Sequence, residues 1–293
     1  MKAKVGFIGL GAIGRPMAKH IVQKFDGMVW NRTAERASEF CKEYGCKVAT
    51  RPSELIRWAD VVISCLPTSK EVRDLVERDD NGWRQGQLLI DCTSGDPASG
   101  RATAEWLKQK GVGFVDAPVS GGTSGAEAGK LTVMVGGEKE SFDRAKPFIE
   151  AFGTRIVHVG PPGAGHAVKA VNQVLLAINI QAAGEGLAAL AKLGVKASAA
   201  LEVINGSSGR SNVTENLIPQ RVVTRAYPRT FKLALLDKDV GIALQILKET
   251  GVPSDATAES KRFMEKTRRA LGEEADHVEA IREIEKAARV EIR

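Results

Sequence analysis

The sequence contains few cysteines and nothing that resembles a targeting segment. Its four cysteines, Cys41, Cys46, Cys65 and Cys92, show neither a CxxC pair nor zinc-ligand spacing with the four histidines. We therefore expect reduced thiols, no metal site and a cytoplasmic protein. The N-terminal residues MKAKVGFIGLGAIG lack the apolar run and the small-residue cleavage site of a secretory signal peptide.

Long apolar runs and concentrated positive charge are also missing. The most apolar stretch, residues 170–191, is interrupted by five polar side chains, so we expect a helix buried in protein rather than in lipid. The net charge of +6 comes from 42 basic and 36 acidic residues and divides evenly between the two halves. Because no basic arm stands out, neither a nucleic acid nor a membrane is an expected partner.

Aromatic residues are scarce in the second half, where only Tyr227, Phe231 and Phe263 follow Phe152. Before residue 160, short apolar runs alternate with amphipathic stretches of helical length, which predicts an α/β domain with a parallel sheet covered on both faces. The strands are expected at residues 4–8, 28–30, 61–66, 88–91, 112–115, 131–135 and 155–159.

The segment Gly160-Pro161-Pro162-Gly163 marks the predicted boundary between two domains, residues 1–162 and 163–293. After it, segments rich in Ala, Leu, Glu and Lys predict an all-helical second domain. The helices are expected at about residues 164–193, 196–206, 211–224, 231–249, 254–271 and 276–288.

A glycine-rich turn, Gly9-Leu10-Gly11-Ala12-Ile13-Gly14, follows the first predicted strand and opens the first helix. In a dinucleotide-binding turn the first glycine permits the sharp bend, the second lets the backbone approach a pyrophosphate, and the third allows close helix packing. The helix N-terminus would then receive the pyrophosphate. A tight turn without a ligand is the alternative interpretation.

The end of the second strand bears on the choice of cofactor. An NAD-selective fold usually places Asp or Glu there, whereas this chain has Asn31-Arg32-Thr33. A 2′-phosphate would meet no carboxylate, while Arg32 can grip it and Asn31 and Thr33 can donate hydrogen bonds. NADP is therefore the favoured cofactor, and NAD is the alternative. Arg32 has an alternative interpretation as well, as a solvated residue at the start of a helix that binds no cofactor.

Small polar residues follow two further strands, at Leu66-Pro67-Thr68 and Cys92-Thr93-Ser94. Ligands of open α/β sheets lie beyond the carboxyl ends of the strands, so contacts to a ribose or nicotinamide are expected there, although simple turns explain both segments nearly as well. The predicted cofactor contacts are Leu66, Pro67 and Ser94.

A loop of small residues, Asp116-Ala117-Pro118-Val119-Ser120-Gly121-Gly122, follows the strand at residues 112–115. Backbone N–H groups unshielded by side chains can cradle an anion, and Ser120 adds a hydroxyl. A substrate carboxylate would fit Ser120, Gly121 and Gly122, and a flexible connection is the alternative.

The helix after the boundary carries a lysine in apolar surroundings. Lys169, Asn172 and Gln173 share one face, followed by Val174 and further apolar residues. Lys169 either extends along a domain interface or lies in a cleft, where it can exchange a proton with a substrate hydroxyl or carbonyl. For His166, a hydrogen-bonding role at the helix start is favoured over catalysis.

Together these motifs resemble the β-hydroxyacid dehydrogenase family. The resemblance covers essentially the whole chain and rests on residues 9–18, residues 116–122, the Lys169 helix with Asn172, and Lys238-Asp239. Within that family the 3-hydroxyisobutyrate dehydrogenases are most similar, especially over residues 120–137 and 207–211. Asn212 departs from their pattern, because an aromatic residue often follows the Ser-Gly-Arg segment, and this leaves the substrate open.

The resemblance implies an N-terminal Rossmann-type doubly wound sheet, a long interdomain helix, and an all-α C-terminal domain that builds a homodimer or homotetramer. It also implies that Lys169 is catalytic, that Asn172 orients it or the substrate, and that Lys238 lies near the substrate and the nicotinamide. We expect an oxidoreductase that transfers a hydride between NADP(H) and a small hydroxy acid or aldehyde acid. Asn31-Arg32-Thr33 also resembles NADP-using glyoxylate and succinic semialdehyde reductases of the family; an imine reductase and a non-catalytic NADP-binding module are more distant alternatives.

Overall fold

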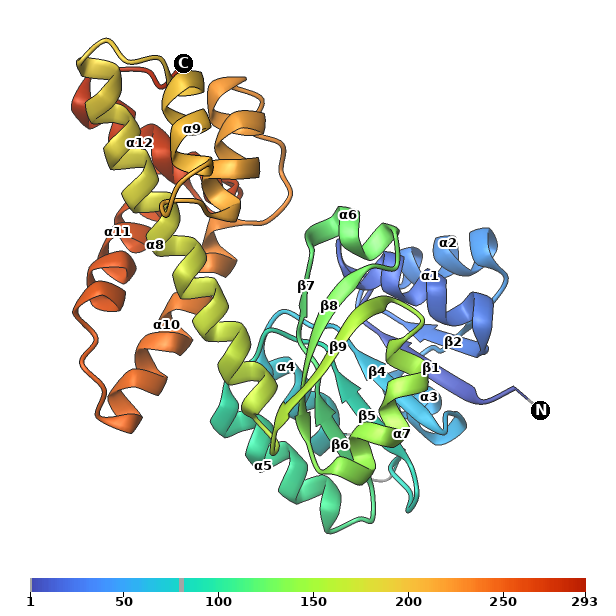
Figure 1. Cartoon of the computed structure of the whole chain (residues 1–293). Coiled ribbons are helices and arrows are strands. Elements are labelled where there is room, and N and C mark those ends of the chain that lie inside the picture. Colours follow the sequence, from blue (N-terminus) through green and yellow to red (C-terminus); the bar gives the residue numbers. More distant parts are fainter. Residues whose placement is uncertain (1, 79–81) are drawn as a thin grey trace. The chain divides into compact units, whose positions relative to one another are not determined.

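The structure is a computed structural model and describes residues 2–78 and 82–293. It contains two compact units, Met1–Lys169 and Ala170–Arg293. The first unit holds the sheet, and the second consists of helices (Figure 1). This arrangement confirms the predicted fold class of an α/β sheet domain followed by an all-helical region.

The sheet of the first unit is mixed rather than purely parallel. Its order is β3-β2-β1-β4-β5-β6-β8-β7, with β9 paired to β8. The strands are β1 (Lys4–Ile8), β2 (Asp26–Trp30), β3 (Lys47–Val48), β4 (Val61–Ser64), β5 (Leu88–Asp91), β6 (Gly113–Asp116), β7 (Val119–Ser120), β8 (Leu131–Gly137) and β9 (Gly153–Gly160).

Strands β1 to β6 are parallel and have the order 3-2-1-4-5-6 of dinucleotide-binding folds. The predicted parallel sheet is thus found over β1 to β6, and β8 departs from it, because β8 pairs antiparallel with both β6 and β7. Strands β7 and β8 form a hairpin whose connection contains the short helix α6 (Gly122–Glu127), so the chain reverses its direction between them.

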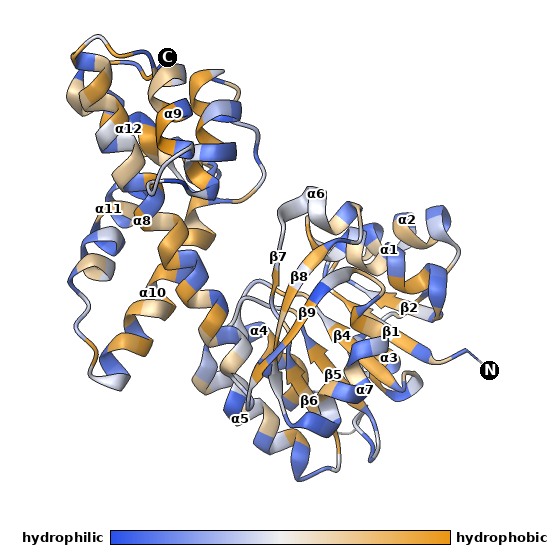
Figure 2. Ribbon diagram, viewed as in Figure 1, coloured by the Kyte–Doolittle hydropathy of each residue, from blue (hydrophilic) through white to orange (hydrophobic). Residues whose placement is uncertain are grey.

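Helices cover both faces of this sheet. They are α1 (Gly14–Lys24), α2 (Ala34–Tyr44), α3 (Pro52–Trp58), α4 (Ser69–Arg78), α5 (Pro97–Lys108), α6 and α7 (Lys139–Ile149). Because successive strand residues point to opposite faces, Leu88 and Ile90 of β5 enter one apolar core while Leu89 enters another. The central strands β4 and β5 are buried along their whole length and are largely orange in Figure 2, as expected for strands covered on both faces.

A disulfide joins Cys41 to Cys46, with their Cα atoms 4.7 Å apart. The expectation of reduced cysteines was wrong for this pair. Helix α2 ends at Tyr44, and the next residue, Gly45, has a left-handed conformation (φ +71°) that returns the chain toward the last helical turn. The Gly45 N–H donates to the Cys41 carbonyl. Cys65 and Cys92 are free thiols.

The second unit contains most of the long helix α8 (Ala164–Lys192), then α9 (Ala197–Asn205), η2 (Val213–Val223), α10 (Leu233–Thr250), α11 (Asp255–Leu271), the short η3 (His277–Glu279) and α12 (Ala280–Ala288). These positions agree with the predicted helices to within a few residues. Segment η2 differs in kind, because it is a wider π-helix rather than an α-helix.

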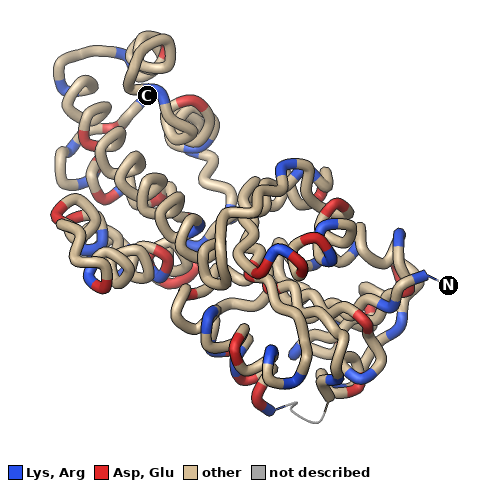
Figure 3. The backbone as a smooth tube through the Cα atoms, turned by 60° about the horizontal axis from the view of Figure 1, so that its bottom comes forward, with Lys and Arg blue, Asp and Glu red and all other residues tan. Residues whose placement is uncertain are grey.

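Helix α8 is long and apolar enough to cross a membrane by length and composition alone. The core helix of a globular domain meets the same criterion, and Val174, Ala177, Ile180 and Leu187 of α8 belong to the apolar core of the second unit. Figure 3 shows Lys and Arg interspersed with Asp and Glu along the described chain, and both signs occur in each unit.

Candidate functional site

The three glycines of the turn between β1 and α1 have different surroundings. Gly9 has φ +101°, and a Cβ there would lie 2.3 Å from the Cys65 carbonyl oxygen. A Cβ on Gly14 would lie 2.0 Å from the Gly9 carbonyl oxygen, whereas a Cβ on Gly11 would meet nothing within 4 Å. Gly9 and Gly14 thus serve the turn and the packing of α1, and the space beside Gly11 is open to a ligand.

The start of α1 fits an anionic group. No side chain at the N-cap residue, Ile13, bonds to the first-turn N–H groups, and the first turn contains no acidic residue. The Arg15 N–H donates to the Gly11 carbonyl (2.9 Å) and Pro16 has no N–H, so it is mainly the partial positive charge of the helix N-terminus that favours a phosphate here. The turn therefore fits the pyrophosphate of a dinucleotide.

Asn31 braces the glycine turn. Its side-chain oxygen accepts a hydrogen bond from the Leu10 N–H (3.0 Å), and its amide nitrogen donates to the Thr33 carbonyl (3.0 Å). Arg32 and Thr33 are exposed. Of the three predicted 2′-phosphate contacts, Arg32 and Thr33 thus face solvent while the Asn31 amide is engaged within the chain.

The two strand ends predicted to contact the cofactor are joined by a hydrogen bond. The Leu66 N–H donates to Thr93 Oγ1 (3.1 Å), and the Thr93 N–H donates to Asp91 Oδ1 (3.1 Å). Pro67 is exposed and Ser94 is half-buried. The structure therefore brings these segments together at the carboxyl ends of β4 and β5, through a threonine that was not among the predicted contacts.

The small-residue loop after β6 has an unusual backbone. Gly121 and Gly122 have φ values of +134° and +64°, which L side chains rarely adopt, and a Cβ on Gly122 would meet nothing within 4 Å. Both glycines are exposed, and Ser120 at the end of β7 is half-buried. The backbone N–H groups are thus not shielded by side chains, as the predicted carboxylate cradle requires.

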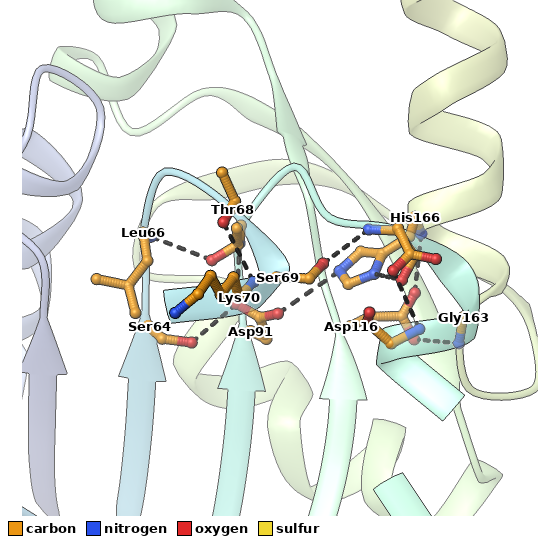
Figure 4. Close-up of polar contacts among 12 residues, drawn as sticks. Ser64, Leu66, Thr68, Ser69, Lys70, Asp91, Asp116, Gly163 and His166 are labelled. Carbon is orange, nitrogen blue, oxygen red and sulfur yellow. Dashed lines mark hydrogen bonds and ion pairs between the residues drawn. The ribbon is translucent and has the colours of Figure 1, made fainter. Parts of the chain in front are cut away.

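Asp116, the first residue of this loop, caps the start of α8 (Figure 4). Its fully buried carboxylate accepts the Gly163 N–H at Oδ1 (2.7 Å) and the His166 N–H at Oδ2 (2.8 Å). A Cβ on Gly165 would lie 2.4 Å from the Met134 carbonyl oxygen. The helix start therefore packs directly on β6 and β8, and Lys169 follows one turn later as a buried side chain, 8% exposed.

A second carboxylate, Asp91, lies beneath the same turn. Asp91 Oδ2 is 3.6 Å from His166 Nε2, and Asp91 Oδ1 accepts the Ser64 hydroxyl (2.8 Å). Burial raises the pKa of the Asp91 carboxyl, although the charge of His166 and the hydrogen bonds from Thr93 and Ser64 oppose that rise. The favoured sequence interpretation of His166 as a hydrogen-bonding residue at the helix start agrees with these contacts.

In the second unit a chain of polar contacts joins two predicted site residues. The Asn172 amide donates to Gln173 Oε1 (3.1 Å), the Gln173 amide donates to Asp239 Oδ2 (3.0 Å), and Lys238 Nζ lies 3.1 Å from Asp239 Oδ1. Gln173 and Asp239 are buried, whereas Asn172 is exposed. Asn172 of α8 and Lys238 of α10 are thus linked through the Asp239 carboxylate.

The sequence interpretation assigned no role to Asp91 or Asp239. Asp91 ends the buried run Leu88–Asp91, and a carboxylate at the end of an apolar strand is a signal that could have identified it. Asp239 lies beside Lys238, but its partner Gln173 is 66 residues away, so no local pattern indicates the contact. Among the described residues, no group of three or more His, Cys, Asp and Glu side chains could hold a metal ion.

Two family models match the chain. Residues 4–160 match the NAD-binding domain of 6-phosphogluconate dehydrogenase, and residues 163–284 match the NAD-binding domain of NADP-dependent 3-hydroxyisobutyrate dehydrogenase. The first match covers the glycine turn and the strand ends that follow it. The second begins at Gly163, so it includes Lys169, Asn172 and Lys238.

Two relatives from Pseudomonas aeruginosa are 35% identical to this chain, and each alignment covers 82% of this chain and 84% of the relative. One is named 3-hydroxyisobutyrate dehydrogenase and the other NAD-dependent L-serine dehydrogenase. The solved structure of Mycobacterium tuberculosis 3-hydroxyisobutyrate dehydrogenase with L-serine is 29% identical, with a TM-score of 0.90, and the match covers 97% of this chain and 99% of that one.

Proposed function

We propose a specific reaction from one premise: this chain belongs to the 3-hydroxyisobutyrate dehydrogenase family and is a nicotinamide-dependent dehydrogenase that acts on a hydroxyl group. The proposed reaction interconverts a short β-hydroxy acid and its aldehyde acid. A bound nicotinamide would supply or accept the hydride. The observation that carries the proposal is the buried Lys169, one turn beyond a helix start anchored by Asp116.

Lys169 moves the proton in this proposal. Its Nζ takes the proton from the substrate hydroxyl during oxidation and returns it to the carbonyl oxygen during reduction. Asn172 orients the lysine or the substrate, and Lys238 lies near the substrate and the nicotinamide. The Asp239 carboxylate, which contacts Lys238 and the Gln173 amide, would hold Lys238 and Asn172 in a defined arrangement.

The substrate carboxylate is assigned to Ser120, Gly121 and Gly122. The Ser120 hydroxyl and the unshielded N–H groups of the two glycines would donate to it, and the positive φ values of the glycines support this role. Because this anchor and Lys169 must serve one molecule, a short substrate is favoured. We further assign cofactor binding to residues 1–162, and substrate binding with assembly as a homodimer or homotetramer to residues 163–293, in a cytoplasmic protein.

NADP is the proposed cofactor. The exposed Arg32 would pair with the 2′-phosphate, and no carboxylate stands at the end of β2 to repel it. The relative named as NAD-dependent keeps NAD as the alternative. Replacing Arg32 with Ala should weaken NADPH binding at least about tenfold, the loss expected for one charge-assisted hydrogen bond, and leave NADH binding nearly unchanged. Equal weakening of both would contradict the assignment of Arg32.

The substrate is proposed to be 3-hydroxyisobutyrate or a close analogue. Serine is a second candidate, because the relatives named for 3-hydroxyisobutyrate and for L-serine are equally similar to this chain. Glyoxylate and succinic semialdehyde remain further candidates, since Asn31-Arg32-Thr33 resembles the reductases that use them. An imine reductase is disfavoured, because such enzymes generally lack the lysine and the carboxylate loop found here.

The test is a kinetic panel followed by absorbance at 340 nm. It combines NADP and NAD with 3-hydroxyisobutyrate, L-serine, glycerate, 4-hydroxybutyrate and glycolate, and NADPH with the corresponding aldehyde acids. The highest kcat/KM is expected for 3-hydroxyisobutyrate with NADP. Tight NADPH binding without turnover on any substrate would contradict the proposal and favour a non-catalytic binding module.

A further inference from the structure

His166 occupies a slot in the first unit that closely fits its imidazole ring. The side chain is 1% exposed. A Cβ on Gly95 would lie 2.7 Å from the ring carbon Cε1, and a Cβ on Gly100 would lie 3.1 Å from Nδ1. Any side chain at Gly95 would therefore displace the ring, so the surrounding backbone is shaped to accept an imidazole.

Three contacts hold His166 in this slot. Its backbone N–H donates to Asp116 Oδ2 (2.8 Å), and its ring Nδ1 lies 3.3 Å from the Asp96 carbonyl oxygen. A carbonyl only accepts, so Nδ1 carries a proton. Nε2 then faces Asp91 Oδ2 at 3.6 Å, and among the described residues it has no hydrogen-bond partner.

Asp91 and His166 are both buried, and their facing atoms, Asp91 Oδ2 and His166 Nε2, are 3.6 Å apart. This separation is longer than a hydrogen bond, so the contact between the two side chains is electrostatic. A buried carboxylate needs polar groups around it, and the His166 ring is one of the groups that surround Asp91.

Asp91 also connects His166 to the predicted cofactor edge (Figure 4). Asp91 Oδ1 accepts the Ser64 hydroxyl of β4 and the Thr93 N–H, and Thr93 Oγ1 accepts the Leu66 N–H. A continuous series of polar contacts thus runs from the ends of β4 and β5 to the first turn of α8.

We propose that His166 is a positioning residue that ties the first turn of α8 to the ends of β4 and β5 and so sets the place of Lys169 relative to the cofactor edge. Lys169 follows His166 by three residues and shares its side of the helix. The proposal rests on the proposed function, since it needs Lys169 to act on a substrate. A displacement of about 1 Å at a reacting group can lower a rate about a hundredfold.

Two substitutions at His166 change its contact with Asp91 to different degrees. In His166→Gln the side-chain amide reaches the position of Nε2 and can still donate to Asp91. In His166→Asn a shorter amide keeps the contact to the Asp96 carbonyl and removes the contact to Asp91 Oδ2, while Asp91 Oδ1 keeps its hydrogen bonds from Ser64 and Thr93. His158→Gln is the matched control, because His158 lies on β9 and contacts the Gly137 carbonyl, outside this series of contacts.

The first measurement does not depend on activity. Hydrogen–deuterium exchange of residues 164–169 is expected to accelerate about tenfold in His166→Asn, because the electrostatic contact between the buried Asp91 carboxylate and the side chain at position 166 is lost, and much less in His166→Gln. Exchange in α7 and in the His158→Gln control should stay at the wild-type rate. Unchanged exchange of residues 164–169 in His166→Asn would overturn the proposal.

The second measurement distinguishes a role of His166 in positioning Lys169 from a role in stability alone. His166→Asn should lower kcat about tenfold or more while the Kd of NADPH stays within about twofold, and the primary deuterium isotope effect on kcat should rise. His166→Gln should recover most of kcat. Faster exchange with an unchanged kcat and isotope effect would overturn the proposal. An inactive wild-type chain would instead contradict the proposed function, and the exchange data would then support or overturn the anchoring of α8 by themselves.

Discussion

Two substitutions in the glycine turn should affect different properties of the protein, although they lie only three residues apart. In Gly14→Ala the new Cβ would lie 2.0 Å from the Gly9 carbonyl oxygen, where real Cβ contacts stay above 3.0 Å, so α1 must move by about 1 Å. In Gly11→Ala the Cβ would meet nothing within 4 Å. The first variant should therefore damage stability, and the second should damage only cofactor binding.

The expected magnitudes follow from these contacts. Overpacking at Gly14 should cost about 1–3 kcal/mol and lower Tm by roughly 3–10 °C for a unit of this size. Gly11→Ala should leave Tm within about 2 °C and raise the Kd of NADPH about tenfold to a hundredfold, because the methyl group would displace the pyrophosphate from one or two N–H donors.

Thermal denaturation measures the first effect, and quenching of tryptophan fluorescence by NADPH measures the second. Both variants and the wild type should be compared in one buffer, since phosphate competes for a helix N-terminus. A wild-type Kd for NADPH in Gly11→Ala would refute the assignment of the open space beside Gly11 to the pyrophosphate. An unchanged Tm in Gly14→Ala would refute the packing argument.

Two further predictions concern stability and thiol chemistry. Burial opposes ionisation of Asp276, but the hydrogen bond and charge of His277 and the N–H groups of Thr230 and Phe231 hold the pKa of Asp276 well below its usual 3.8. Asp276→Asn should therefore lower the free energy of unfolding by roughly 3 kcal/mol at pH 7, as for a broken buried ion pair. A carboxylate whose pKa is lowered by folding stabilises the folded protein at pH values above its unfolded pKa. The difference in the free energy of unfolding between the wild type and Asp276→Asn should therefore shrink as the pH falls below about 4. Urea denaturation at several pH values measures this difference, and a difference that stays constant would contradict the prediction. Burial raises the pKa of the Cys65 thiol to about 12 and that of Cys92 well above its usual value, so a thiol reagent should find no reactive cysteine in the native protein and two, Cys41 and Cys46, after mild reduction. Two reactive thiols before reduction would contradict the disulfide.

Local patterns predicted much of the fold because the signals lie within single segments. Strands β1 and β5 have the predicted bounds, since each is a continuous apolar run. Strands β3 and β7 have two residues each, too few for a periodic pattern, and were missed. The direction of β8 depends on its pairing with β6 and β7, which segment composition does not encode.

For the candidate site, the sequence predicted where several residues lie in the fold, while their roles stay predictions. The glycine turn, the loop at Ser120 and the Lys169 helix have motifs within ten residues or so, and their residues occupy the expected ends of strands and helices. Contacts between distant residues had no such signal: Asp116 meets His166 across 50 residues, and Gln173 meets Asp239 across 66. The Cys41–Cys46 disulfide depended on the turn at Gly45, which cysteine spacing alone did not indicate.

The most direct test of the central claim is the turnover of Lys169→Ala beside its affinity for NADPH. If Lys169 transfers the substrate proton, kcat with the best hydroxy acid should fall at least about a hundredfold, as for loss of a general acid–base group, while the Kd of NADPH and Tm stay close to the wild-type values. Undiminished turnover in a folded, NADPH-binding Lys169→Ala protein would contradict the account.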